Sequence, residues 1–133
     1  MKPSGSPRVL IVEDESLLAM MLEDMLSDLG WEVAANVASV PEALQAIERG
    51  GFDLALLDVN IAGREVFPVA DALQARGVPL VFITGYGEHG IREDLRGYPV
   101  VEKPFHSAQL VRTLHAAAFA GGERRADCRD LSI

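Results

Sequence analysis

The chain has 133 residues, 49% of them apolar and 24% charged, which is ordinary for a soluble globular protein with one hydrophobic core. Its formal net charge of −8 argues against a nucleic-acid-binding protein, whose affinity depends on basic side chains. It has no apolar run long enough to span a membrane and no secretory signal, and its single Cys128 fits a reducing compartment. The composition therefore predicts a cytoplasmic protein without a nucleic-acid or membrane partner.

The two ends of the chain differ in composition from the middle. Residues 1–7 are rich in Pro, Ser and Gly, which predicts a flexible N-terminus. The Gly pair that begins at Gly121 is expected to stop any helix, which leaves 121–133 as a C-terminal tail. Residues 8–120 are therefore expected to form a single domain, and the short remainder leaves no room for an output domain in this chain.

Short apolar runs alternate with helical patterns along this domain. Strands are predicted at residues 8–13, 31–37, 52–58, 79–84 and 100–103. Helices are predicted at 16–29, 39–49, from about 66 to 76, and at 106–120, with at best a short helix within 85–99. The expected N-caps are Ser16, Ser39 and Ser107, and Glu65 is expected near a helix N-terminus.

Strands that are apolar on both faces and alternate with helices predict a parallel sheet covered on both sides. Five such units predict an α/β fold, with a five-stranded parallel sheet in a three-layer sandwich of flavodoxin-like topology. Ligands of such sheets bind beyond the carboxyl ends of the strands, which makes the strand-end residues the candidates for function.

Chemically active side chains stand at the carboxyl ends of four predicted strands: Glu13, Asp14, Asp58, Thr84 and Lys103. Three carboxylates brought together would repel one another, and a divalent cation would relieve that repulsion. An all-oxygen site of this kind suits Mg²⁺, and Asn60 is placed to add its backbone carbonyl. Acids before a helix also favour its N-terminus, so the stretch EDES is expected to serve both purposes.

The chain resembles the receiver domains of two-component response regulators from about Val9 to Phe119. The resemblance lies in four motifs: the acid pair in VLIVEDE, Asp58 in DLALLDVN, Thr84 in VFITG, and Lys103 with Pro104 in EKPF. The stretch FITGY is similar to that of stand-alone receivers with a Phe-x-Thr-Gly-Tyr motif, which signal to other proteins in phosphorelays.

The resemblance implies a phosphoacceptor rather than an enzyme that acts on other substrates. Asp58 would attack a phosphoryl group carried on a histidine of a kinase or phosphotransfer protein. The implied Mg²⁺ ligands are Asp14 and Asp58 directly, Glu13 through water, and the Asn60 carbonyl. Lys103 and Thr84 would contact the phosphoryl oxygens, and the domain would hydrolyse its own acyl phosphate and signal to a partner protein by contact.

The sequence departs from the family in two places. Receivers often carry Met-Pro after the phosphorylated Asp, and here Ile61–Ala62 followed by Gly63 is expected to loosen that turn. Many receivers also carry an aromatic residue three positions before the Lys, where this chain has Val100.

Other functions remain as alternatives. A non-phosphorylated interaction module with the same fold is the main one, and an enzyme acting on small molecules ranks third. The stretch GYGEHG matches the glycine spacing of a dinucleotide-binding loop, but the well-formed helix and the acid that such a site needs do not follow it.

Overall fold

The computed structural model describes residues 7–85 and 90–127. A five-stranded parallel sheet runs through its centre in the order β2-β1-β3-β6-β7. The strands are β1 (Arg8–Val12), β2 (Glu32–Val37), β3 (Leu54–Asp58), β6 (Leu80–Thr84) and β7 (Val100–Glu102). This order is that of the flavodoxin-like doubly wound sheets, so the predicted fold class is confirmed.

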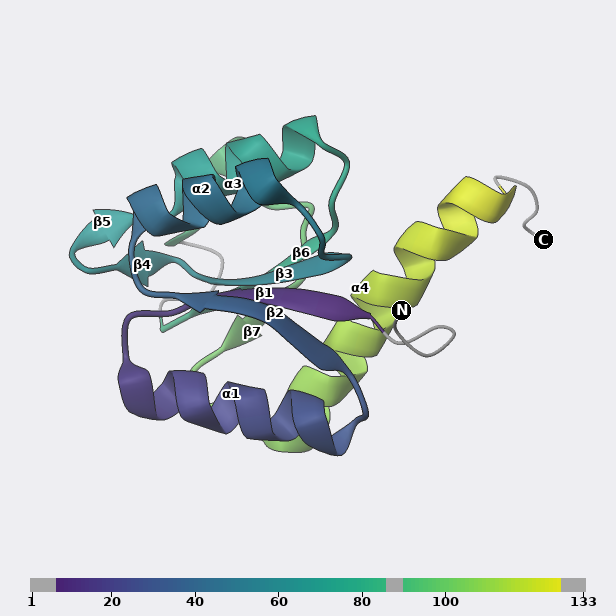
Figure 1. Ribbon diagram of the computed structural model, residues 1–133, viewed down its shortest axis with the longest axis horizontal. Coiled ribbons are helices and arrows are strands. Elements are labelled where there is room, and N and C mark those ends of the chain that lie inside the picture. Colours follow the sequence, from purple (N-terminus) through teal and green to yellow (C-terminus); the bar gives the residue numbers. More distant parts are fainter. Residues whose placement is uncertain (1–6, 86–89, 128–133) are drawn as a thin grey trace.

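Helices cover both faces of the sheet, as Figure 1 shows. One face carries α2 (Val40–Arg49) and α3 (Phe67–Ala75), and the other carries α1 (Ser16–Asp28) and α4 (Ser107–Asp127). The three layers form because β3 and β6 are buried along their whole length and need apolar cover on each side. None of the helices within the described part of the chain is both long and apolar enough to cross a membrane.

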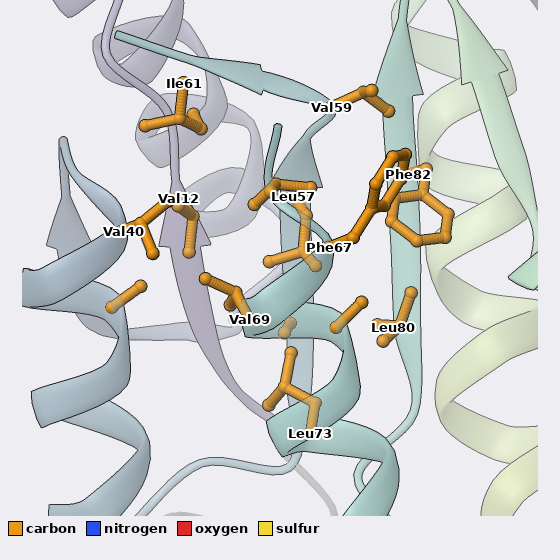
Figure 2. Close-up of a cluster of buried hydrophobic side chains, with 14 of the residues drawn as sticks. Val12, Val40, Leu57, Val59, Ile61, Phe67, Val69, Leu73, Leu80 and Phe82 are labelled. Atoms are coloured by element: carbon orange, nitrogen blue, oxygen red, sulfur yellow. The ribbon is translucent and has the colours of Figure 1, made fainter. Parts of the chain in front are cut away.

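The core between the sheet and α2 and α3 contains a chain of aromatic rings. Phe67 of α3 packs edge-on against Phe82 of β6, with the ring centroids 6.4 Å apart (Figure 2). Phe82 in turn meets Tyr98 at 6.3 Å, just before β7. Burial of one such large side chain contributes roughly 1.5–3 kcal/mol relative to exposure, so this core holds the strands, and hence their carboxyl ends, in place. Val100, at the position of the expected aromatic, is half-buried against this core.

The N-cap predicted at Ser39 is confirmed. The Glu42 N–H donates to Ser39 Oγ at 3.3 Å, and the Glu42 carboxylate accepts from the Ala38 N–H at 3.1 Å. Gly50 follows the last turn with a φ of 70°, a conformation that suits glycine. Gly30 closes α1 in the same way, with a φ of 81°.

The caps predicted at Ser16 and Ser107 are wrong. Both residues are the first of their helices, and Glu15 is the N-cap of α1, without a side-chain capping bond. The segment before α1 is fixed instead by Glu13, whose carboxylate accepts the Glu15 N–H at 2.9 Å. At α4 the His106 carbonyl accepts from the Leu110 N–H, which makes His106 the residue that flanks the helix.

The predicted helix stop at Gly121 is also wrong, because α4 continues to Asp127. A glycine inside a helix costs about 1 kcal/mol relative to alanine, and the flanking Ala, Glu and Arg residues are good helix formers. The last turns of α4 extend past the sheet (Figure 1). The domain limits at residues 8–120 and the tail at 121–133 remain predictions.

A small hairpin after β3 was not predicted. It consists of β4 (Asn60–Ile61) and β5 (Arg64–Glu65), joined by a two-residue turn. Ala62 and Gly63 adopt φ values of 52° and 79°, the positive values that a tight hairpin turn requires. The expectation of a loosened turn is therefore wrong, since the buried Ile61 side chain and the Val66 N–H to Val59 carbonyl bond of 2.9 Å close the hairpin.

Among the described residues between β6 and β7 there is no α-helix, as expected, and the 3-10 turn η2 (Glu93–Leu95) precedes β7. Arg92 ties it to α3 by hydrogen bonds to Asp71 and Asp94, and its guanidinium lies 5.7 Å from the centroid of the Phe67 ring. The stretch GYGEHG lies largely outside the described residues, which omit 86–89.

Candidate functional site

A pocket of about 660 Å³ opens at the carboxyl edge of the sheet. Its described lining is Glu13, Asp14, Glu15, Asp58, Val59, Asn60, Glu65, Thr84, Gly85, Gly90 and Lys103. The six candidate site residues of the sequence analysis therefore all line one pocket. They meet there because the ends of parallel strands β1, β3, β6 and β7 share one edge of the sheet.

Asp58, the last residue of β3, is buried at the bottom of this pocket, with 6% of its surface exposed. Lys103 Nζ donates to Asp58 Oδ2 at 2.9 Å. The Asn60 N–H donates to Asp58 Oδ1 at 3.1 Å. Each carboxylate oxygen thus has a donor, which fixes the orientation of the group toward the pocket.

Thr84 and Lys103 are brought together by the pairing of β6 with β7. The Lys103 N–H donates to the Thr84 carbonyl at 2.8 Å, and the Thr84 side chain lies in the pocket wall with 1% of the residue exposed. Burial alone would lower the pKa of Lys103, but the hydrogen bond to Asp58 and the nearby acids raise it above its usual value. The surroundings of Lys103 therefore favour its charged ammonium form at the edge of the pocket.

Glu13 is the least satisfied polar group of the site. It is 3% exposed, and its Oε2 accepts the Glu15 N–H at 2.9 Å, while its buried Oε1 has no hydrogen-bond partner among the residues that the structure describes. Burial, together with the neighbouring Asp58, raises the pKa of Glu13 from 4.5 to about 8, against the opposing effects of the Glu15 N–H and Lys103. A buried carboxylate of this kind destabilises the folded protein unless it binds a proton or a cation.

Glu13, Asp14 and Asp58 form a cluster that could hold a metal ion. Each offers one carboxylate oxygen, and these oxygens all lie within 4.8 Å of one another. The orphaned Glu13 Oε1 and the all-oxygen donor set fit a hard cation such as Mg²⁺. Asp14 is exposed at the rim, where its Oδ2 also accepts the Ala62 N–H at 2.9 Å.

Two acids of the pocket, Glu15 and Glu65, were not among the predicted site residues. Glu15 is adjacent to the acid pair, so its position could have been anticipated. Glu65 lies next to the N-cap of α3, Val66, as expected, but it also belongs to β5 and lines the pocket. Only the hairpin brings it there, and no sequence signal had indicated the hairpin.

Comparison with known proteins gives a consistent result. The family model described as the response regulator receiver domain matches residues 9–115. The solution structure of SdrG from Sphingomonas melonis Fr1 is 43% identical, with a TM-score of 0.77, and the match covers 86% of this chain and 98% of that one. A crystal structure of the anti-anti-sigma factor PhyR from Bartonella quintana is 29% identical, with a TM-score of 0.76, over 92% of this chain and 51% of the other.

Among curated proteins, the phyllosphere-induced regulator PhyR of Methylorubrum extorquens is 34% identical over 116 residues, which are 84% of this chain and 43% of that protein. The chain spans about half the length of the curated relatives it matches. The fold, the acidic cluster at the carboxyl edge of the sheet and these matches agree, and the chain belongs to the response regulator receiver domain family, the signalling domains of two-component systems.

Proposed function

We propose that Asp58 accepts a phosphoryl group from a phosphohistidine of a kinase or phosphotransfer protein in a reaction that depends on Mg²⁺. The observation that carries this proposal is the state of Asp58: a nearly buried carboxylate, 2.9 Å from the Lys103 ammonium and grouped with Glu13 and Asp14. Structural ion pairs are balanced, whereas this group has more acids than bases, as a site for a cation and a phosphoryl group requires.

In the proposed transfer, an oxygen of Asp58 attacks phosphorus and the bond from phosphorus to the donor histidine nitrogen breaks. The electron pair of that bond returns to the imidazole, which leaves as a neutral ring after it takes up a proton. The Lys103 ammonium, already beside Asp58 Oδ2, offsets the charge on the transferred oxygens. The Thr84 hydroxyl, in the pocket wall, donates a hydrogen bond to a second phosphoryl oxygen.

Glu13, Asp14 and Asp58, together with the backbone carbonyl of Asn60, would hold Mg²⁺ at this edge. When bound, the ion neutralises negative charge that builds up on the phosphoryl group and on the clustered carboxylates. The role of Glu13 is to supply the buried oxygen that otherwise lacks a partner.

The acyl phosphate formed on Asp58 is proposed to be hydrolysed in the same pocket, which is open to solvent through its exposed rim at Asp14 and Glu15. The chain would thus catalyse only its own phosphorylation and dephosphorylation. Signalling would come from the change in charge and hydrogen bonding at Thr84 and Lys103, which a partner protein reads by contact.

The phosphodonor is proposed to dock on α1. Leu17, Met20 and Met21 of this helix are large apolar residues that are 70%, 60% and 50% exposed. The helix begins directly after Glu15, which lines the pocket, so a protein bound to this patch would lie beside Asp58. Exposed apolar residues grouped on one helix are typical of a protein interaction surface.

The downstream partner is proposed to be a protein, and the protein is proposed to act in the cytoplasm, as its composition predicts. The Bartonella quintana relative is described as an anti-anti-sigma factor, so a protein that controls a sigma factor is one class of partner to test. This chain matches only about half of that relative.

The test is intact mass after incubation with acetyl phosphate and Mg²⁺. We expect one added phosphoryl group on the wild type, and none on Asp58→Asn or when EDTA replaces Mg²⁺. Asp24→Asn, which removes an exposed acid of α1 outside the pocket, is the matched control and should be modified like the wild type. An unmodified wild type, under conditions that modify a known receiver, would favour the non-phosphorylated interaction module.

A further inference from the structure

The β4–β5 hairpin forms one wall of the pocket and is held from both sides. It stands at the carboxyl edge of the sheet (Figure 1), where its buried Ile61 packs in the core beneath α2 and α3. The Val66 N–H to Val59 carbonyl bond closes its base, and the Ala62 N–H to Asp14 Oδ2 bond of 2.9 Å ties its tip to the segment after β1. The backbone of the hairpin is therefore held in place relative to the strand end that carries Asp58.

Glu65 is the charged residue that this hairpin presents to the pocket. It pairs with Asn60 across the two short strands, and Asn60 is two residues beyond Asp58. Its side chain is exposed and lines the pocket, and within the described parts of the chain it has no ion-pair or hydrogen-bond partner. Its negative charge therefore acts on any ligand that enters the pocket.

The position of Glu65 matters because the pocket already contains more acids than bases. Among the described lining residues, Lys103 is the one base, against the acids Glu13, Asp14, Glu15, Asp58 and Glu65. A divalent cation with Lys103 would balance the inner three acids and leave the charges of Glu15 and Glu65 uncompensated at the entrance. A pocket entrance of one sign lowers the local concentration of ligands of the same sign and slows their association.

We propose that Glu65 is a specificity-determining residue that discriminates among phosphodonors by charge, slowing the reaction of small, highly anionic ones. The proposal rests on the function proposed for Asp58. A donor whose phosphoryl group carries compensating positive charge meets less repulsion from Glu65 than one whose charge is bare.

The experiment compares two small donors of different charge, the more anionic acetyl phosphate and the zwitterionic phosphoramidate. Rates of Asp58 modification are measured at saturating Mg²⁺ for the wild type, Glu65→Gln and Glu48→Gln. Glu48 is an exposed acid of α2 outside the pocket, so its variant changes the net charge equally without changing the pocket.

At low ionic strength we expect Glu65→Gln to react with acetyl phosphate about threefold faster or more, and to gain clearly less with phosphoramidate. The gain should shrink when salt is added, since exposed charges are screened within about 10 Å at 0.1 M salt. Glu48→Gln should react like the wild type with both donors.

Three results would overturn the inference. Glu65→Gln could react no faster than the wild type, it could gain equally with both donors, or Glu48→Gln could match it, which would indicate an effect of net charge. In each of these cases the wild type is still modified, so the function proposed for Asp58 stands. A wild type that neither donor modifies would overturn both proposals.

Discussion

The charged side chains at the two edges of the central sheet differ in whether they have partners of opposite charge. At the amino edge, Arg8 is the first residue of β1, and both its side chain and its backbone N–H have partners. Its guanidinium contacts the Glu32 carboxylate at 3.2 Å and the Gly51 carbonyl. Its backbone N–H donates to the Asp53 carboxylate at 2.9 Å. At the carboxyl edge, the three clustered acids Glu13, Asp14 and Asp58 outnumber Lys103, and within the described part of the chain Glu13 keeps an oxygen without a hydrogen-bond partner.

The difference separates charges that support the fold from charges that cost it stability. At the amino edge the Arg8–Glu32 ion pair is direct and partly exposed, and such a pair typically contributes modest stability. The carboxyl-edge acids are buried or crowded, and a crowded carboxylate destabilises the folded state until a proton or cation arrives. An arrangement that is unfavourable without a ligand indicates a ligand site.

The largest expected effect is that of Lys103→Ala on phosphorylation. The variant removes the ammonium 2.9 Å from Asp58, so the modification rate with acetyl phosphate should fall by about a hundredfold. Time-resolved intact mass measures this rate. Arg8→Ala removes a positive charge from the other edge and should leave the rate unchanged; a similar fall in both variants would erase the contrast between the edges.

The second prediction concerns pH in the absence of metal. The pKa of Glu13 in the folded protein is about 8, above its ordinary 4.5, so the folded state holds a proton that the unfolded state has lost. The free energy of unfolding in EDTA should therefore fall as pH rises from about 5 to about 8, by about 2 kcal/mol once solvent screening is allowed for. Urea titrations at each pH measure this slope.

Glu13→Gln is the control for this prediction. The variant cannot lose the proton, so we expect its stability in EDTA to vary much less over the same range and to exceed that of the wild type at the upper end. Mg²⁺ should restore stability to the wild type at high pH and do little for the variant. A wild type whose stability rises with pH in EDTA would contradict the proposed strain at the carboxyl edge.

A smaller effect is expected at the amino edge. Arg8→Ala breaks the contacts to Glu32 and Gly51, both partly exposed, and should lower the free energy of unfolding by about 0.5–1 kcal/mol. Because this edge has no part in the cation site, the loss should be the same in Mg²⁺ and in EDTA. Denaturant melts in the two buffers test this, and a loss that depends on Mg²⁺ would show that the edges are coupled.

The smallest effect is expected from Ala62→Gly in the hairpin turn. Ala62 has a φ of 52°, which costs an alanine more than a glycine, so the variant should match the wild type or gain about 0.5 kcal/mol. Ala72→Gly in the middle of α3 should instead lose about 1 kcal/mol. Thermal melts compare the two, and a clear loss in Ala62→Gly would mean that the turn differs from the one described.

The sequence predicted the sheet and the contents of the pocket well because both follow from strong patterns. Apolar runs such as those of β3 and β6 have to be buried, and the rule that parallel strands end at one edge then groups Asp58 with Thr84. No local signal indicated the hairpin, because an alanine at a positive φ, as at Ala62, is not a recognised turn residue. The place of Glu65 in the pocket wall was therefore not predicted either.

The helix ends also show how far local sequence signals can be trusted, because some of them were predicted correctly and others were not. Ser39 is a cap, as predicted, because its hydroxyl faces an unbonded N–H of the first turn. Ser16 lies one residue too late for that role, since Glu13 fixes the preceding segment, and the Gly pair after Ala120 does not end α4. Such choices depend on small energies that neighbouring segments can outweigh.

The most direct test of the central claim, that the carboxyl edge is a cation-dependent phosphoacceptor, is to locate the modified residue. After reaction with acetyl phosphate, borohydride reduces an aspartyl phosphate to homoserine, which tandem mass spectrometry assigns to a position. We expect conversion at Asp58 alone, and only with Mg²⁺ present. Conversion at Asp14 or elsewhere, or equal conversion in EDTA, would contradict it.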